Sequence, residues 1–229
     1  MNTVNVWAVI HHLNGPLTLE QAHLALDAGA YGVFLISHEG ADHELPSLAT
    51  TIKSVRSADG RSLCVGINLL TEKDPTAAFE LAAANALDAV WIDEPGIVAG
   101  EARAPALKLA RARDVFPGSA KPRVFASVAF KYQAEDPTPA KSARAARALG
   151  FTPTTSGKAT GQPPTVEKIQ LMHGTSSQGL AVASGMSPEN IASYRALLSD
   201  VLVATGVSLD EHRFDYEKLR DFVHAARGT

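Results

Sequence analysis

Residues 62–94, SLCVGINLLTEKDPTAAFELAAANALDAVWIDE, decide the fold that the sequence predicts. A short apolar run at residues 62–68 is followed by an alanine- and leucine-rich segment at 75–88 and by a second apolar run at 89–94. A strand, a helix and a strand in this order form a βαβ unit, in which the two strands lie parallel. The stretch therefore predicts a parallel sheet that is covered by helices.

The same alternation continues along the whole chain. Strands are predicted at residues 4–11, 31–37, 62–68, 89–94, 123–130, 151–156, 179–184 and 201–206. Helices are predicted at residues 18–30, 45–59, 75–88, 104–116, 138–150, 165–174, 187–200 and 214–228. Eight such units in 229 residues fit a parallel, eight-stranded (β/α)8 TIM barrel, with residues 1–229 as a single domain. A doubly wound sheet is the competitor, but its first turn usually carries a GxGxxG motif, which HHLNGPLT at residues 11–18 lacks.

Composition and charge narrow the class of protein. The net charge of -3 gives no overall field that favours nucleic acid or an acidic membrane surface. The single cysteine, Cys64, excludes an intramolecular disulfide and a cysteine-based zinc cluster. No Lys or Arg precedes Lys53, so the apolar start of the chain is predicted to be a strand and not a signal peptide. No apolar stretch is long enough to cross a bilayer, so we expect a cytoplasmic enzyme or binding protein.

Residues 182–191, VASGMSPENI, predict an anion site after the seventh strand. Ser187 is a favourable N-cap and Pro188 suits the first turn of a helix, whose start carries unpaired N–H groups and partial positive charge. Phosphate often binds in the loops after strands seven and eight of this fold, and ATGVS at 204–208 follows strand eight. The predicted phosphate-binding residues are Ser184, Gly185, Met186, Gly206 and Val207. An ordinary junction between a strand and a helix is the alternative.

Side chains alternate along a strand, so the sequence also predicts which of them point into the barrel. The predicted outward set of the fifth strand is Val124, Ala126, Val128 and Phe130, which leaves Ser127 and Lys131 pointing inward. In the third strand the same alternation turns Val65 and Ile67 outward and Asn68 inward. It also turns His11 and Asp93 inward at the ends of their strands. These side chains are predicted to converge on the mouth of the barrel.

The predicted catalytic residues are Asp93, Lys131 and His11, with Asn68 and Thr155 orienting substrate hydroxyl groups. A carboxylate next to an amine can transfer protons, and a lysine with a lowered pKa can form a Schiff base. Two alternatives stay open. In the first, Asp93 and Lys131 form an ion pair that has only a structural role. In the second, the register of the first strand is shifted by one residue, and His12 points inward in place of His11.

Residues 37–44, SHEGADHE, gather imidazole and carboxylate groups after the second strand. The cluster comprises His38, Glu39, Asp42, His43 and Glu44. Such groups can hold a divalent ion, but their spacing matches no defined metal motif, so we expect a solvated loop and assign no metal ligands. The long connection at residues 157–164, GKATGQPP, is either a lid over the site or a surface loop.

Three segments of the second half resemble the BtpA family of TIM barrels. They are TTSGKATGQPPTVEKI at residues 154–169, VASGMSPENIASY at 182–194 and VLVATGVS at 201–208, and the resemblance extends over about residues 85–208. It implies a barrel similar to the ribulose-phosphate-binding barrels. It also implies a ligand site that includes Ser156, Gly157, Thr160 and Gly161, with Ser184, Gly185 and Gly206 around a phosphate. One class of members is linked to photosystem I assembly, and others are described as enzymes acting on nucleotides or sugar phosphates.

Three hypotheses about function follow. The first is an enzyme of isomerase or lyase type that binds a sugar phosphate or a nucleotide at the loops after strands seven and eight, without a cofactor but with Mg²⁺ left open. The second is a non-catalytic barrel that binds a metabolite or acts as an assembly factor. The third is a metal-dependent hydrolase that uses the cluster at residues 38–44. A phosphorylated small molecule is the expected partner, with no nucleic acid and no membrane insertion, and homo-oligomerisation is left open.

Overall fold

The chain forms a closed barrel of eight parallel strands, as a computed structural model shows for residues 3–117, 121–174 and 179–228. In order around the barrel the strands are β1 (Asn5–His11), β2 (Gly32–Ile36), β3 (Cys64–Asn68), β4 (Ala89–Ile92), β7 (Arg123–Ser127), β8 (Thr152–Thr155), β9 (Ala181–Val182) and β10 (Asp200–Val203). Strand β10 pairs with β1 and closes the ring. The predicted (β/α)8 barrel is confirmed.

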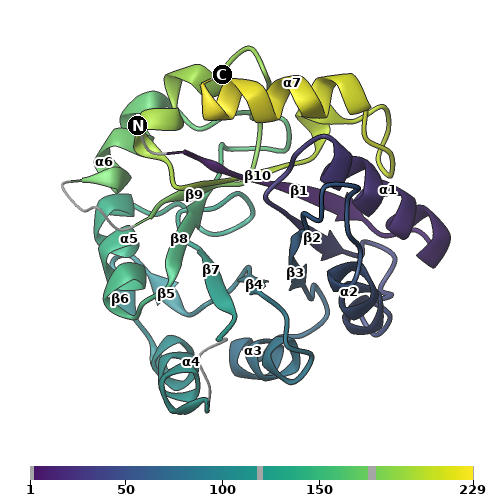
Figure 1. Ribbon diagram of the computed structural model, residues 1–229. Coiled ribbons are helices and arrows are strands. Elements are labelled where there is room, and N and C mark those ends of the chain that lie inside the picture. The colour runs from purple at the N-terminus through teal and green to yellow at the C-terminus, as the bar shows by residue number, and fades with distance from the viewer. Residues whose placement is uncertain (1–2, 118–120, 175–178, 229) are drawn as a thin grey trace.

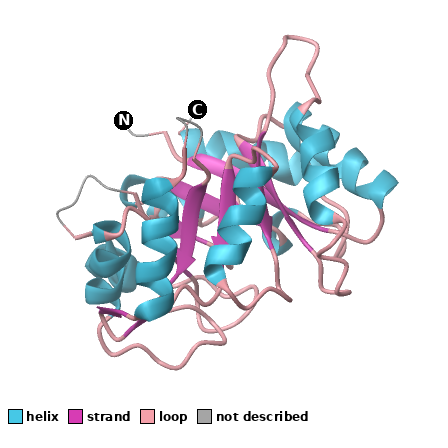
Figure 2. Ribbon diagram, turned by 90° about the horizontal axis from the view of Figure 1, so that it is seen from below, coloured by secondary structure: helices cyan, strands magenta, loops and turns pink. Residues whose placement is uncertain are grey.

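Helices form a ring outside the strands (Figure 1). They are α1 (Gly15–Asp27), α2 (Leu45–Lys53), α3 (Pro75–Ala84), α4 (Ala104–Val115), α5 (Pro139–Ala148), α6 (Val166–His173) and α7 (Tyr216–Arg227). A two-stranded hairpin, β5 (Ile97–Val98) with β6 (Glu101–Ala102), was not predicted and follows β4. Figure 2 shows long loops and this hairpin gathered beyond the arrowheads of the strands.

Short polar side chains fix where several helices begin. Asn14 accepts a hydrogen bond from Leu17 N at 3.0 Å, and Asp74 accepts one from Thr76 N at 2.9 Å. Thr165 and Asp215 cap α6 and α7 in the same way. Each cap satisfies an N–H group that the first helical turn leaves without a partner. Because the caps set the starts of the helices, they also set the lengths of the loops that lead into them.

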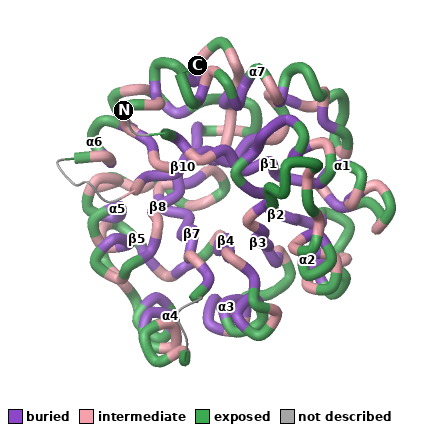
Figure 3. The backbone as a smooth tube through the Cα atoms, in the orientation of Figure 1, coloured by how far each residue is buried: buried purple, intermediate pink, exposed green. Residues whose placement is uncertain are grey.

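Most residues of the strands are buried (Figure 3), and the strands separate two apolar cores. The outer core lies between strands and helices and includes Val65, Val124 and Ala126, as predicted. The inner core fills the barrel with aromatic rings, which are Trp7, Phe34, Trp91, Phe125 and Phe130. Phe130 was predicted to point outward, and this was wrong. Strand β7 ends at Ser127 and Ala129 adopts a φ of 49°, so the alternation does not continue to Phe130.

The helix predicted at residues 187–200 does not form. In its place lie two short 3-10 turns, η1 (Ile191–Ser193) and η2 (Arg195–Leu197). The Ser187 N–H donates to Asn190 Oδ1 at 2.9 Å, and Ser187 O accepts from Asn190 N and Ile191 N, so one helical turn starts at Ser187 but no α-helix follows it. The buried Tyr194 hydroxyl donates to Pro164 O at 2.8 Å, and this tertiary contact fixes a segment whose backbone forms only short turns. The helix terminus that supported the predicted anion site is therefore absent.

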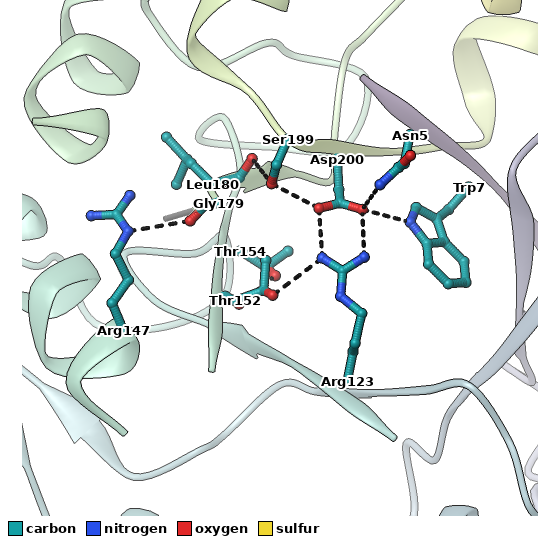
Figure 4. A network of polar contacts seen from close by, with 10 residues as sticks. All are labelled: Asn5, Trp7, Arg123, Arg147, Thr152, Thr154, Gly179, Leu180, Ser199 and Asp200. Carbon is teal, nitrogen blue, oxygen red and sulfur yellow. Dashed lines mark hydrogen bonds and ion pairs between the residues drawn. The ribbon is translucent and has the colours of Figure 1, made fainter. Parts of the chain in front are cut away.

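A buried ion pair closes the amino-terminal end of the barrel (Figure 4). The Arg123 guanidinium donates to both carboxylate oxygens of Asp200, at 3.0 and 2.7 Å. Trp7 Nε1, Asn5 Nδ2 and Ser199 Oγ also donate to this fully buried carboxylate. Burial opposes ionisation of Asp200, but the hydrogen bonds and charge of Arg123 outweigh it and hold the pKa below its usual range. The contact ties β10 to β7 and β1 across the barrel.

No helix in the described part of the chain is long and apolar enough to cross a membrane.

Candidate functional site

A cavity of about 360 Å³ opens at the carboxyl ends of the strands. This is the end of a (β/α)8 barrel at which active sites occur. Its wall includes ten of the residues that the sequence predicted for the site, which are His11, Asn68, Asp93, Lys131, Thr160, Gly161, Ser184, Gly185, Met186 and Gly206. The structure therefore brings the predicted catalytic groups and most of the predicted ligand loops to one place.

Asp93 is a half-buried carboxyl group in the wall of this cavity, whereas Glu72 and Glu94 in the same wall are exposed. Asn68 Nδ2 lies 3.4 Å from both of its carboxylate oxygens, and Ser127 Oγ lies 3.4 Å from one of them. Burial raises the pKa of Asp93, and the hydrogen bonds from Asn68 and Ser127 offset this only in part. A carboxylate whose pKa is raised is a stronger base than an exposed carboxylate, so it can take a proton from a bound substrate.

His11 lines the cavity and His12 does not, so the register alternative is settled. His12 is buried outside the barrel, with Nδ1 2.8 Å from Thr18 Oγ1 and Nε2 3.3 Å from Glu44. The ring of His11 meets that of His38 edge to face, with centroids 4.9 Å apart. Burial, and then the neighbouring His38, lower the pKa of His11 to about 4. Its Nδ1 is buried without a hydrogen-bond partner among the described residues. His11 is thus a neutral imidazole with a nitrogen available to a ligand.

Lys131 does not form the structural ion pair with Asp93 that was left open as an alternative; no such pair is found within the described ranges. Its Nζ donates to Thr160 Oγ1 at 3.1 Å, and the Tyr132 hydroxyl lies 2.8 Å from the same oxygen. These contacts hold the long loop at residues 157–164 against the end of β7. The amine therefore remains at the rim of the cavity.

Three glycines of the site are explained by close packing of its loops. A Cβ atom at Gly185 would lie 2.2 Å from backbone atoms of Gln162 and Pro163, and one at Gly157 would lie 2.0 Å from Gln162 O. A Cβ atom at Gly206 would lie 2.1 Å from Met186 O. Gly185 also adopts a φ of 65°, which other residues rarely do. These positions let the loops after β8, β9 and β10 contact one another directly.

Four predicted ligand residues do not line the cavity, so the expectation that they contact a ligand is not met by this geometry. Thr155 Oγ1 donates to Ala129 O at 3.0 Å, and Ser156 Oγ accepts from Lys131 N at 2.7 Å. Gly157 packs against Gln162, and the Val207 side chain is buried in the outer core. Thr155 and Ser156 instead fix the loops that carry Lys131.

The loop after β9 offers backbone donors. Within the described ranges, no hydrogen bond uses the N–H groups of Ser184, Gly185 and Met186. The Ser184 hydroxyl is engaged elsewhere, because it donates to Ala159 O and Gln162 O. Free backbone N–H groups in a turn are a common means of binding an anion.

The cluster predicted at residues 38–44 does not form one centre. Asp42 is buried and accepts from Thr71 N and Thr71 Oγ1, both at 2.7 Å. Glu44 lies next to His12 and His43, whereas His38 lies against His11. Over the residues that the structure describes, no group of three or more metal-binding side chains is found. The geometry gives no support to the metal-dependent hydrolase.

Several residues of the site were missed from the sequence. Trp91 and Phe130 line the cavity, and His38, Gln133 and Thr205 lie in its wall. Gln133 could not be found by strand parity, because it lies in a loop and donates to Asp93 O at 2.7 Å and Ser127 O at 3.1 Å. His38 could have been found, since it comes directly after the predicted second strand and so lies close to His11, the last residue of the first strand.

Comparison with known proteins places the chain in a family. No family model matches it. It is 31% identical to the uncharacterised protein TK2179 of Thermococcus kodakarensis over 194 residues, which cover 79% of this chain and 71% of that protein. The chain belongs to the TK2179 family.

Solved structures similar to this TK2179-family chain share its fold. Phosphoribosyl anthranilate isomerase from Thermus thermophilus is 17% identical, covers 97% of this chain and 98% of its own, and has a TM-score of 0.65. Thiamine phosphate pyrophosphorylase from Pyrococcus furiosus is 12% identical, with 99% and 97% covered and a TM-score of 0.67. (S)-3-O-geranylgeranylglyceryl phosphate synthase from Thermoplasma acidophilum, solved with its substrate sn-glycerol-1-phosphate, is 14% identical, with 100% and 95% covered and a TM-score of 0.66. At these identities the likeness concerns the fold alone.

Proposed function

We propose that this protein is an enzyme that binds a phosphorylated small molecule, a sugar phosphate or a nucleotide, and performs acid–base chemistry of isomerase or lyase type. One observation carries the proposal. A single cavity at the carboxyl ends of the strands joins Asp93, Asn68 and Lys131 to a loop, residues 184–186, whose backbone N–H groups are free within the described ranges. Enzymes with phosphorylated substrates among the similar barrels agree with it.

The phosphate is proposed to bind between the loops after β9 and β10. The N–H groups of Ser184, Gly185 and Met186 would donate to its oxygens, and the adjacent loop at Thr205 and Gly206 would complete the site. This proposal keeps the predicted location but replaces the predicted helix terminus by turn backbone. The amine of Lys131 supplies positive charge at the same rim.

Asp93 is proposed to be the group that accepts the proton in the reaction. With its raised pKa, Asp93 takes a proton from the substrate, and Lys131 supplies a proton at a second position, while the neutral His11 hydrogen-bonds a substrate group. Asn68 positions the carboxylate and is close enough to bind a substrate hydroxyl. No step in this scheme needs a cofactor, and Mg²⁺ is proposed at most as a companion of the phosphate.

We also propose that the chain is related to the BtpA family. The support lies in the segments at residues 154–169, 182–194 and 201–208, which form the loops around the proposed phosphate site. The BtpA resemblance leaves the reaction open, so the proposed chemistry rests on the cavity.

A charge placed at Thr205 tests the phosphate site. Thr205 is exposed and lines the cavity, so Thr205→Asp is expected to fold and to repel a phosphate. Inorganic phosphate, ribose 5-phosphate and nucleoside monophosphates are expected to raise the Tm of the wild type, because a ligand of the folded state stabilises it by mass action. We expect Thr205→Asp to weaken binding about tenfold or more, which corresponds to about 1.4 kcal/mol.

The matched control is Thr205→Asn, which has the same shape without the charge and is expected to keep most of the Tm shift. Parallel series with and without Mg²⁺ show whether the phosphate needs the ion. Equal shifts for the Asp and Asn variants would place the phosphate elsewhere. If no phosphorylated compound changes the Tm of the wild type, the enzyme proposal fails and the non-catalytic assembly factor becomes the better hypothesis.

A further inference from the structure

The cavity has an apolar floor that the proposed phosphate and proton-transfer groups leave unused. Its residues belong to the inner core of the barrel and are Val9, Ile36, Trp91, Phe130, Ala183 and Leu202. The polar groups of the cavity, by contrast, come from the strand ends and loops above this floor. The cavity is therefore divided into an apolar part and a polar part.

Trp91 presents no polar atom that is free to bind a substrate. Its indole N–H donates to Ser127 Oγ at 2.9 Å, within the protein. Its ring packs edge to face on Phe130, with centroids 5.9 Å apart. The two rings form an aromatic corner of the kind that receives another flat ring by stacking or edge contact.

A sugar on this floor would be poorly bound. Each hydroxyl group that exchanges water for Val9, Ile36 or Leu202 loses hydrogen bonds that these side chains cannot replace. An apolar ring in the same place gains by leaving water, since burial of a phenyl-sized group strengthens binding about tenfold to hundredfold. The floor thus selects against a substrate that is polar along its whole length.

We propose that the substrate is a phosphate ester whose other end is a flat, apolar ring, and that this ring binds against Trp91 and Phe130. The inference rests on the proposed function, because the phosphate must occupy the loops after β9 and β10 for the rest of the molecule to reach the floor. Asp93, Asn68 and Lys131 lie in the wall of the same cavity, so the reacting atoms are those that link the ring to the phosphate.

Binding of simple phosphate esters to the wild-type protein is the first test. Phenyl phosphate is expected to bind about tenfold to hundredfold more tightly than glycerol phosphate or ribose 5-phosphate, from the apolar area that the ring buries. The chain has two tryptophans, and Trp7 is buried at the closed end of the barrel. In a Trp7→Phe variant, phenyl phosphate is therefore expected to change the emission of Trp91, whereas inorganic phosphate leaves it nearly unchanged.

Ala183→Leu is the second test, because Ala183 lies in the floor and a larger apolar side chain fills the space meant for the ring. We expect the preference for phenyl phosphate to fall at least tenfold while glycerol phosphate still binds. If the variant does not fold, the wild-type affinities and the Trp91 emission are sufficient to test whether an apolar ring binds on this floor.

The outcomes separate the two proposals. Equal affinity for phenyl, glycerol and ribose phosphates, or an unchanged Trp91 emission, overturns the aromatic substrate and leaves the phosphate site standing. Binding of none of these compounds overturns the proposed function together with the inference that rests on it.

Discussion

Replacing Arg123 with methionine is expected to lower the free energy of unfolding by about 3 kcal/mol at neutral pH. The variant leaves the fully buried Asp200 carboxylate without its bidentate partner, while Trp7, Asn5 and Ser199 still donate to it. We take the lower end of the range for a broken buried ion pair because the Arg123 side chain is 37% exposed. Urea denaturation at pH 7 measures the effect.

The effect of Arg123→Met depends on pH in a direction that the structure predicts. In the wild type the pKa of Asp200 is lowered, so its contribution is complete above the unfolded value of about 3.8 and is lost as the pH falls through the folded value. Without Arg123, burial dominates and raises the pKa of Asp200, so acid protonates it in the folded variant. The difference in stability between the two proteins is therefore expected to shrink between pH 7 and pH 4.

The matched control is the double variant Arg123→Met/Asp200→Asn, which removes both charges. It is expected to be more stable than Arg123→Met alone, since no buried charge is left without a partner. A double variant that loses as much stability as the sum of the two single variants would show that the two side chains do not act as a pair.

Replacing Asp93 with asparagine is expected to reduce kcat by about 10²–10⁴-fold on the phosphate ester that the binding experiments identify. The change keeps the shape of the side chain and removes its ability to exchange a proton. Affinity for the phosphate is expected to stay within a few-fold of the wild type, because the proposed phosphate donors lie in the loop at residues 184–186. Steady-state kinetics and the Tm shift together separate the two roles.

Glu80→Gln is the control for Asp93→Asn, since it removes an exposed carboxylate on α3 that does not line the cavity. We expect this variant to turn over at close to the wild-type rate. If Asp93→Asn retains full turnover, proton transfer by Asp93 is wrong, whichever substrate is used.

The architecture could be predicted because it depends on local patterns. Alternation within residues 62–68 placed Val65 and Ile67 outside the barrel and Asn68 inside it, as the structure has them. The same rule failed at Phe130, where the strand has already ended and the backbone has turned at Ala129. Alternation therefore predicts which way a side chain points only where the hydrogen bonds between strands continue. The sequence does not show at which residue those hydrogen bonds end.

The positions of the site loops could be predicted from the sequence, but their conformations could not. The sequence of residues 187–200 has a good cap and a good first turn, yet it forms only short turns, and the Tyr194 hydroxyl binds Pro164 O thirty residues away. Contacts between distant segments thus overrule a local helix preference. The glycines at residues 185 and 206 were predicted as places where an anion approaches, whereas what approaches them most closely is the backbone of neighbouring loops.

The most direct measurement is a two-dimensional NMR titration of the isotope-labelled protein with glycerol phosphate, which reports on each backbone N–H separately. We expect the largest chemical-shift changes at Ser184, Gly185 and Met186, with smaller ones at Thr205 and Gly206, and much smaller changes at all five residues in Thr205→Asp at the same subsaturating ligand concentration. Changes confined to other parts of the chain, or no change at all, would contradict the claim that this barrel binds phosphate between the loops after β9 and β10.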